Sequence, residues 1–322
     1  MRALITGGSG FVGANLVRRL LRDGHQVHLI VRPSYQPWRL REIVKEVELH
    51  KIDLEDREGV RAAIAAVKPD SVFHLAAFGA YPDQTGIDRT ISTNLLGTSS
   101  LLDACIAENV GAFVQAGSSS EYGYKDHPAE ESERLEPNSH YAITKAAATH
   151  YCQWAARKAG IHAVTLRLYT IYGPYEDPGR LIPTLLMCGM EGRLPPLVSP
   201  RTARDFVYVD DAVSAIMRVS ALPELPCGAV YNVCTGSQSI LADVVAHARE
   251  LLGIAERPQW SSMDPRPWDT DAWVGSPAAM ERDTGWRASM GLREGLASTI
   301  AWFKEHPVWI HFYREKIVGS KG

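Results

Sequence analysis

Two side chains that can exchange protons stand four residues apart, at Tyr141 and Lys145. If this segment is helical, the spacing places the phenol and the ammonium group on the same face of the helix. A run of hydroxyls, Ser118-Ser119-Ser120, follows an apolar stretch earlier in the chain. A phenol, an ammonium group and a hydroxyl that meet at one point can move a proton to or from the oxygen of a carbinol or carbonyl carbon during hydride transfer.

The direction of this proton transfer depends on the pKa of Tyr141. A free tyrosine has a pKa of about 10, and lowering it to ~7 requires about 4 kcal/mol, at ~1.36 kcal/mol per pH unit. An ion pair in water contributes only about 1 kcal/mol, so Lys145 must be partly buried and must be aided by an oxidised nicotinamide or by local dipoles. In the reducing direction Tyr141 instead donates its proton, and Ser118 hydrogen-bonds to the same oxygen.

A hydride carrier is predicted by the glycine-rich segment from Thr6 to Gly13. The segment follows the first predicted strand and opens the first predicted helix, which is the context of a dinucleotide fingerprint. Gly7 permits a tight turn, Gly10 lets the backbone approach a pyrophosphate, and Gly13 lets the helix pack closely on the strand. The N-terminus of the helix then offers unpaired N–H groups to the phosphates.

The end of the second predicted strand indicates which dinucleotide is bound. NAD sites usually have an acidic residue there for the ribose hydroxyls, whereas this chain has Val31 and Arg32. Arg32 either pairs with a 2′-phosphate, helped by Ser34 or Arg39, or is a solvated loop arginine. The pattern favours NADP(H) over NAD(H).

Short apolar strands alternate with helices in the first half of the chain. This alternation predicts an α/β fold with a Rossmann-type, doubly wound parallel sheet. The predicted strands are Arg2–Thr6, Gln26–Arg32, Val47–Ile52, Ser71–Leu75, Ala112–Ala116 and Ala163–Leu168. The first predicted helix begins at Phe11 and is ended by Gly24. The other predicted helices span Asp56–Val67, Gly86–Glu108 and Ser139–Ala159.

After Leu168, Gly and Pro residues break the pattern into short pieces. We expect a dinucleotide-binding domain over residues 1–169, with returning segments near 205–237, and a smaller, mixed α/β substrate-binding lobe from residues 170–204 and 238–315. Strands predicted at Val207–Val209 and Val230–Val233 bring the chain back to the sheet.

Composition narrows the range of partners. The 322 residues include 34 Lys and Arg against 37 Asp and Glu, so no general attraction to nucleic acid or to anionic membranes is expected. The five cysteines form no Cys-x-x-Cys pair and have no His cluster at zinc-ligand spacing, which predicts reduced thiols and no metal. No segment has the form of a signal peptide or a membrane span, which predicts a cytoplasmic protein.

The sequence resembles the extended short-chain dehydrogenase/reductases, a family of nucleotide-sugar epimerases, dehydratases and reductases. The resemblance extends from the glycine turn to Thr284-Gly285-Trp286, nearly the whole chain. Besides the turn and the Tyr141 and Lys145 pair, it is carried by Asp53-Leu54, His74-Leu75-Ala76-Ala77, Asn94, Gly117–Gly123 and Tyr231–Gly236.

The resemblance implies roles for individual residues. In the family motif the catalytic hydroxyl stands four residues before the Tyr of a Tyr-Gly pair, which gives the catalytic set Ser118, Tyr141 and Lys145. The implied cofactor-binding residues are Gly7, Gly10, Phe11, Val12, Gly13, Arg32, Asp53, Leu54, Leu75, Ala76, Ala77, Asn94, Tyr141 and Lys145. The implied substrate-binding residues are Ser119, Ser120, Thr170, Arg204 and Arg266, with the two arginines on the diphosphate and Thr170 in place of a common Asn.

Within the family, the chain is most similar to GDP-4-keto-6-deoxymannose reductases and related 4-ketohexose reductases. The resemblance therefore implies NADPH-dependent reduction of a nucleotide-linked 4-keto-6-deoxyhexose, with Tyr141 as proton donor, in a homodimer formed through the helices at 86–108 and 139–159. Dehydration is disfavoured because Ser119 and Ser120 replace the acids that dehydratases commonly have. The alternatives are an NAD-dependent nucleotide-sugar C4 epimerase with the same residues and a non-catalytic dinucleotide-binding regulator.

Overall fold

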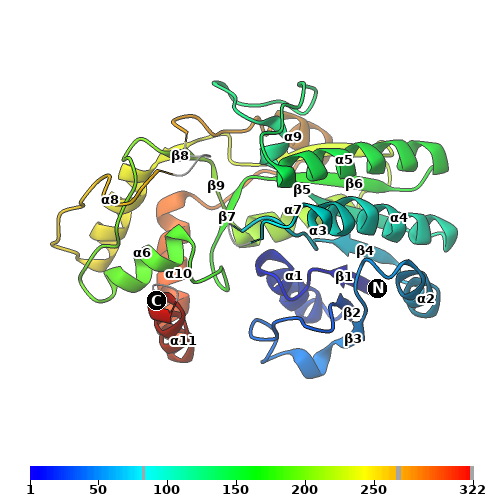
Figure 1. Cartoon of the computed structure of the whole chain (residues 1–322), viewed down its shortest axis with the longest axis horizontal. Coiled ribbons are helices and arrows are strands. Elements are labelled where there is room, and N and C mark those ends of the chain that lie inside the picture. Colours follow the sequence, from blue (N-terminus) through cyan, green and yellow to red (C-terminus); the bar gives the residue numbers. More distant parts are fainter. Residues whose placement is uncertain (82–83, 266–269, 320–322) are drawn as a thin grey trace.

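The computed structural model describes residues 1–81, 84–265 and 270–319. Its centre is a seven-stranded sheet with the order β10-β6-β5-β4-β1-β2-β3, in which every neighbouring pair is parallel (Figure 1). These strands are β1 (Arg2–Thr6), β2 (Gln26–Val31), β3 (Glu48–Lys51), β4 (Ser71–His74), β5 (Ala112–Ser118), β6 (Ala163–Leu168) and β10 (Ala229–Val233). The strand order reverses between β1 and β4, where open α/β sheets bind ligands at the carboxyl ends of their strands.

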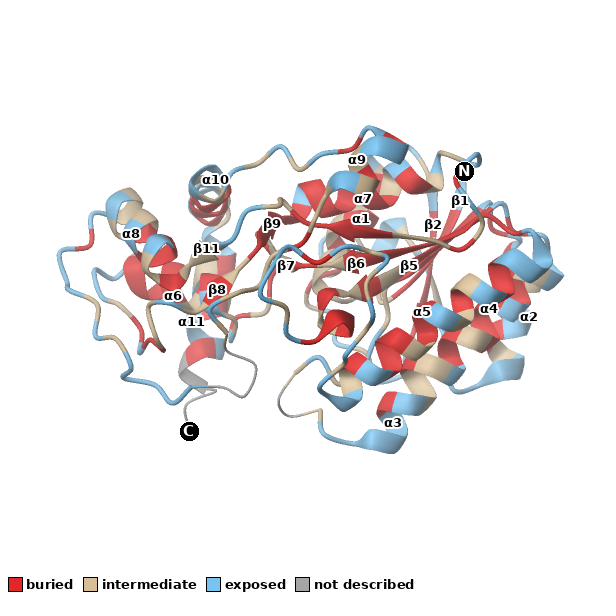
Figure 2. Cartoon of the chain, turned by 90° about the horizontal axis from the view of Figure 1, so that it is seen from above, coloured by how far each residue is buried: buried red, intermediate tan, exposed pale blue. Residues whose placement is uncertain are grey.

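Helices cover both faces of this sheet. On one face lie α1 (Phe11–Arg22) and α7 (Val209–Ser220), and on the other lie α2 (Arg57–Val67), α4 (Thr98–Ala107) and α5 (His140–Ala159) (Figure 2). The strands alternate accordingly, since Ile5 packs in the core under α1 and Leu4 in the core under α2 and α4. The predicted fold class is therefore confirmed.

One predicted helix, Gly86–Glu108, is not uniform. The structure begins it with α3 (Ile87–Ile91), continues through a π-helical segment, η2 (Ser92–Gly97), and ends it with α4. Three side chains explain the π-helical turn. The hydroxyls of Ser92, Thr98 and Ser100 each donate a hydrogen bond to the carbonyl four residues earlier, and so compete with the backbone N–H groups for these carbonyl oxygens.

The second half forms a smaller lobe around its own buried cluster. Its elements are β7 (Thr170–Tyr172), α6 (Leu181–Gly189), β8 (Ala203–Arg204), β9 (Phe206–Tyr208), β11 (Ser239–Ile240), α8 (Leu241–Leu252), α10 (Leu292–Glu305) and α11 (Pro307–Gly319). The helix α9 (Ala278–Thr284) instead packs against β10 of the main sheet. The aromatic residues Trp302, Trp309 and Tyr313 pack in this cluster. The division into two domains stays a prediction.

The strand predicted at Val207–Val209 does not join the main sheet. It appears as β9, which pairs with β7 in a separate two-stranded ladder. The reason is local, since α7 begins at Val209 and the edge beside β6 is occupied by β10. The return to the sheet predicted at Val230–Val233 is made by β10. Within the described ranges, no helix is both long enough and apolar enough to cross a membrane.

Candidate active site

The glycine turn between β1 and α1 has the shape that a pyrophosphate requires. Gly7 has a φ of +73°, and a Cβ there would stand 2.5 Å from the backbone N of Ala76. A Cβ on Gly13 would collide with the carbonyl oxygen of Gly7, whereas on Gly10 it would meet only that oxygen, at 3.1 Å, among the described atoms. No side chain caps α1 at Gly10. The turn therefore leaves open space and unpaired N–H groups where a dinucleotide phosphate fits.

A buried histidine holds the end of β4 beside this turn. His74 hydrogen-bonds through Nδ1 to the Thr6 hydroxyl and through Nε2 to the Thr98 hydroxyl, both at 2.7 Å. Burial lowers the pKa of His74 to about 3, so the ring is neutral. The backbone N–H of Leu75 donates to the carbonyl of Thr6 at 3.0 Å. The predicted cofactor residues Leu75, Ala76 and Ala77 are thus placed next to the glycine turn.

Three other predicted cofactor residues lie near the same edge. Leu54 is buried, and Asp53 is partly exposed just after β3. The Asn94 amide is held by the protein, because its Oδ1 accepts from the N–H of Phe78 and its Nδ2 donates to the Phe78 carbonyl, both at 2.8 Å, and to Thr144 at 3.0 Å. Asn94 therefore fixes the loop after β4 against α5, and its direct contact with a cofactor stays a prediction.

The two arginines considered for a 2′-phosphate differ in burial. Arg32 is exposed directly after β2. Arg39 is buried, donates from Nε to the carbonyl of Tyr175 at 2.7 Å, and stacks on Trp38 at 4.0 Å. The Arg39 guanidinium thus joins the segment after β2 to the loop after β7, and its contribution to binding a 2′-phosphate stays a prediction. Sequence spacing alone does not reveal that burial.

The structure brings the predicted phenol and hydroxyl into contact. Ser118 is the last residue of β5, Tyr141 lies in the first turn of α5, and the two side chains are close enough for Ser118 to affect the pKa of Tyr141. Desolvation raises the pKa of Tyr141 to about 12, and the Ser118 hydroxyl opposes this shift. The phenol is therefore protonated at neutral pH and ready to donate.

Lys145 lies one turn further along α5 and is 3% exposed, which confirms the predicted burial. Its ammonium group donates to the carbonyl of Ala116 at 2.5 Å. Burial lowers the pKa of Lys145, and the nearby carboxylate of Glu121 opposes this effect. The Lys145 ammonium group is thus held at the end of β5, close to Ser118.

A buried ion pair, absent from the predicted site, fixes the turn that carries Ser118. One oxygen of Glu121 accepts from the N–H of Ser118, and the other pairs with Arg167, each at 2.9 Å. Arg167 also donates to the Tyr122 hydroxyl, which donates to Asn232, both at 2.8 Å. The network therefore joins β5, β6 and β10 beneath the site. Its sequence signal is an arginine inside the apolar strand Ala163–Leu168, which needs a buried anionic partner.

The predicted substrate residues around Ser118 have defined partners. The Ser119 hydroxyl accepts from the indole N–H of Trp273 at 3.1 Å, and the Ser120 hydroxyl lies 2.7 Å from that of Ser118. The Arg204 guanidinium lies over the Trp273 ring at 5.6 Å. Trp273, which sequence reasoning missed, therefore connects two of the predicted substrate positions. Arg266 lies outside the described residues.

A cavity of about 430 Å³ opens between the glycine turn and the lobe. Phe11 borders it on the side of the turn, and Thr170, Arg180 and Arg204 border it on the side of the lobe. Glu176 also lines this space and is buried, and its Oε2 has no hydrogen-bond partner among the described residues. Burial raises the pKa of Glu176 to about 8. No local pattern marks this carboxyl group in the sequence, because it stands in a loop rich in Gly and Pro.

Comparison with known proteins agrees with this geometry. Residues 3–234 match the NAD dependent epimerase/dehydratase family. The chain is 29% identical over 321 residues to a dTDP-glucose 4,6-dehydratase of Streptomyces griseus, a match that covers 95% of both chains. The chain therefore belongs to the NAD dependent epimerase/dehydratase family, and it is an NAD(P)-dependent enzyme of the extended short-chain dehydrogenase/reductase type.

Solved structures show the same fold. A UDP-glucose 4-epimerase of Thermotoga maritima, solved with UDP-glucose, has a TM-score of 0.85 and 26% identity, and the match covers 95% of this chain and 99% of that one. A UDP-glucose 4-epimerase of Thermus thermophilus, solved with NAD, has a TM-score of 0.82 and 30% identity, with 95% and 100% covered.

Proposed function

We propose that the protein catalyses the NADPH-dependent reduction of a nucleotide-linked 4-keto-6-deoxyhexose to the 4-hydroxy sugar. The observation that carries this proposal is the position of the Tyr141 phenol, which desolvation keeps protonated, beside Ser118 at the carboxyl end of β5. The nicotinamide supplies the hydride when it is bound. As the C4 carbonyl carbon accepts the hydride, Tyr141 transfers its proton to the C4 oxygen and Ser118 hydrogen-bonds to that oxygen.

Lys145 supports this step electrostatically. The Tyr141 phenolate left by proton transfer is stabilised by a nearby ammonium charge in surroundings of low dielectric constant. The phenolate then regains a proton from solvent. We assign Lys145 a second contact with the ribose of the cofactor, in line with the family resemblance.

Elimination of water is disfavoured by the groups around Ser118. Dehydration needs a base and an acid beside the sugar, whereas Ser119 and Ser120 offer hydroxyls that already bond to Trp273 and Ser118. Glu121 is committed to Arg167 and to the backbone of Ser118. None of these three side chains is a free carboxyl group.

The preference for NADPH rests on the exposed Arg32. A charge-assisted hydrogen bond to a 2′-phosphate contributes roughly 1.5–3 kcal/mol, so Arg32→Ala should lower the ratio of kcat/KM for NADPH to that for NADH by about 10-fold or more. Arg22→Ala is the matched control, since Arg22 is exposed in the last turn of α1. An unchanged ratio in Arg32→Ala would show that the enzyme does not select its cofactor through this residue.

Epimerisation at C4 is the second candidate. It is favoured by the similarity to UDP-glucose 4-epimerases, one of which was solved with NAD. The same Tyr141 and Ser118 would then act in oxidation and re-reduction, with no net use of cofactor. A purified protein that keeps a tightly bound dinucleotide and interconverts 4-hydroxy sugars would support the epimerase. The Tyr141 and Lys145 pair argues against a regulator without turnover.

One experiment separates these activities. Nucleotide-linked 4-keto-6-deoxyhexoses and their 4-hydroxy counterparts are each incubated with NADPH, with NADH or without added cofactor, and products are identified by mass and NMR spectroscopy. The reductase oxidises one NADPH for each 4-keto sugar consumed. Conversion of a 4-hydroxy sugar to its C4 epimer without cofactor consumption would refute the reductase and support the epimerase.

We also propose a homodimer formed through α3, η2, α4 and α5. Large apolar side chains are exposed on these helices: Ile87, Ile91, Leu96, Ile143 and Trp154. Apolar side chains gathered on neighbouring helices are typical of an interface. Sedimentation equilibrium should give twice the chain mass of 35.5 kDa, and a monomer at micromolar concentration would refute this assembly.

A further inference from the structure

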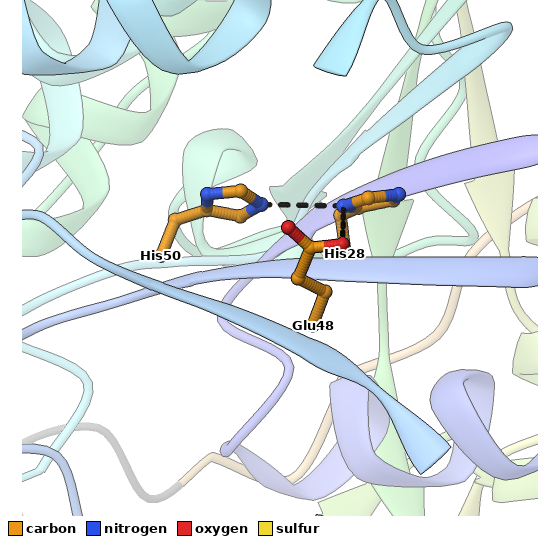
Figure 3. Close-up of side chains that lie close together, drawn as sticks. All are labelled: His28, Glu48 and His50. Carbon is orange, nitrogen blue, oxygen red and sulfur yellow. Dashed lines mark hydrogen bonds and ion pairs between the residues drawn. The ribbon is translucent and has the colours of Figure 1, made fainter. Parts of the chain in front are cut away.

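A second group of potential ligands lies away from the glycine turn, on the edge strand β3 and its neighbour β2. His28 is in β2, and Glu48 and His50 are in β3 (Figure 3). The parallel register pairs His28 with Glu48, and His50 follows two residues later. Because side chains alternate along a strand, all three project from one face of the sheet. One donor atom from each residue lies within 4.8 Å of the others.

The distances suit a metal ion of the zinc class. Nδ1 of His28 lies 3.2 Å from Nε2 of His50 and 3.4 Å from Oε2 of Glu48. Bond lengths of 2.0–2.1 Å in a tetrahedral site separate neighbouring ligand atoms by about 3.3–3.4 Å. These two gaps therefore match two edges of a zinc coordination tetrahedron, and the ligand atoms of Glu48 and His50 lie within 4.8 Å of each other.

Electrostatics also favours a cation at this point. Nδ1 of His28 faces an imidazole nitrogen and a carboxylate oxygen together, as Figure 3 shows. A neutral imidazole ring carries a single N–H proton. One hydrogen bond at Nδ1 of His28 therefore uses that proton and leaves lone pairs of neighbouring atoms facing each other.

We propose that His28, Glu48 and His50 bind one divalent transition-metal ion, with Zn²⁺ as the favoured ion. Two imidazoles and one carboxylate form a recurrent three-ligand set for such ions. The Glu48 side chain is 68% exposed, so a water molecule can complete the coordination. The ion would link β2 to the outermost strand, β3, and so protect the free edge of the sheet. This site is independent of the proposed reductase activity.

The test is a titration of the metal-free, full-length protein with Co²⁺ and Zn²⁺. We expect one equivalent of Co²⁺ to give the visible absorption of a four- or five-coordinate ion, one equivalent of Zn²⁺ to displace it, and Zn²⁺ to raise the Tm. His50→Gln should abolish stoichiometric binding and the Tm shift, and Glu48→Gln should weaken binding about 10-fold or more. In the absence of metal, Tm values equal to that of the wild type would show that these variants remain folded.

His127→Gln is the matched control. His127 also lies between two carboxylates, 2.8 Å from that of Asp126 and 3.1 Å from that of Glu133, but no second imidazole joins this group among the described residues. Binding should be unchanged in this variant. The proposal is overturned if the wild type binds no stoichiometric metal, if His50→Gln binds it equally well, or if a thiolate-to-cobalt band places the ion on a cysteine.

Discussion

The two parts of the candidate active site are built differently. The side that carries Ser118 and Tyr141 stands on long elements, β5 and α5, and a buried ion pair lies beneath it. The opposite side belongs to the lobe, where two-stranded ladders, loops and the first residues of α6 surround the cavity. Thr170 and Arg204 each lie in a strand of only two or three residues. The proposed proton donor thus stands on long elements and the predicted substrate contacts on short segments, which can change without disturbing Tyr141.

The largest effect should come from removing the proton donor on the rigid side. Tyr141→Phe should lower kcat by about 10³-fold, since general acid catalysis contributes roughly 10²–10⁴-fold. Tyr151→Phe is the matched control on the same helix, because its hydroxyl bonds to Asp103 at the surface. Steady-state kinetics with the active sugar from the substrate panel measures both. Equal kcat values for Tyr141→Phe and the wild type would remove Tyr141 from the mechanism.

Breaking the buried ion pair beneath the site should have the next largest effect, a loss of unfolding free energy. Glu121→Gln leaves Arg167 buried without its anion, which costs about 3–5 kcal/mol of unfolding free energy. Urea unfolding followed by tryptophan fluorescence measures the loss. Glu281→Gln, in the exposed pair with Arg287, should cost less than about 1 kcal/mol. Similar losses in the two variants would show that the buried pair is not what stiffens this side.

On the lobe side, Glu176 should make the stability of the protein depend on pH. Its pKa of about 8 in the folded protein exceeds the ordinary value of 4.5, so the folded state holds the proton more tightly than the unfolded state. The wild type should therefore lose stability as the pH rises from about 5 to 8. Glu176→Gln should remove this slope and raise the unfolding free energy at pH 8 by on the order of 4 kcal/mol. Parallel stability profiles for the two proteins would contradict this assignment.

The smallest effect should come from Arg204. Arg204→Lys retains the charge but loses the planar group that lies over Trp273, so KM for the nucleotide sugar should rise about 10-fold with little change in kcat. Arg201→Lys, in an exposed pair with Asp271, should leave both constants unchanged. A fall in kcat without a change in KM would instead indicate that Arg204 acts in the chemical step and not in substrate binding.

The parts that sequence could predict are those with a local signature. Strand and helix periodicity predicted the sheet, and the spacing of Tyr141 and Lys145 predicted a shared helix face. The Glu121 and Arg167 pair joins residues 46 positions apart, so no local pattern contains it. The burial of Arg39 against Trp38 has no local signature either, because a charged side chain after a strand is usually solvated. The lobe gave the weakest prediction, since its short strands are set by tertiary pairing.

The position of β10 has a consequence for synthesis on the ribosome. This strand lies beside β6 but follows it by some sixty residues of chain, most of which form part of the lobe. Asn232, the partner of Tyr122, belongs to β10. A nascent chain that has not yet released this strand exposes the side of β6 and leaves the Tyr122 hydroxyl without its acceptor. A pause in translation before residue 229 should therefore leave a partly folded chain. Chaperones can bind this chain, and its exposed β6 can pair with the wrong strand.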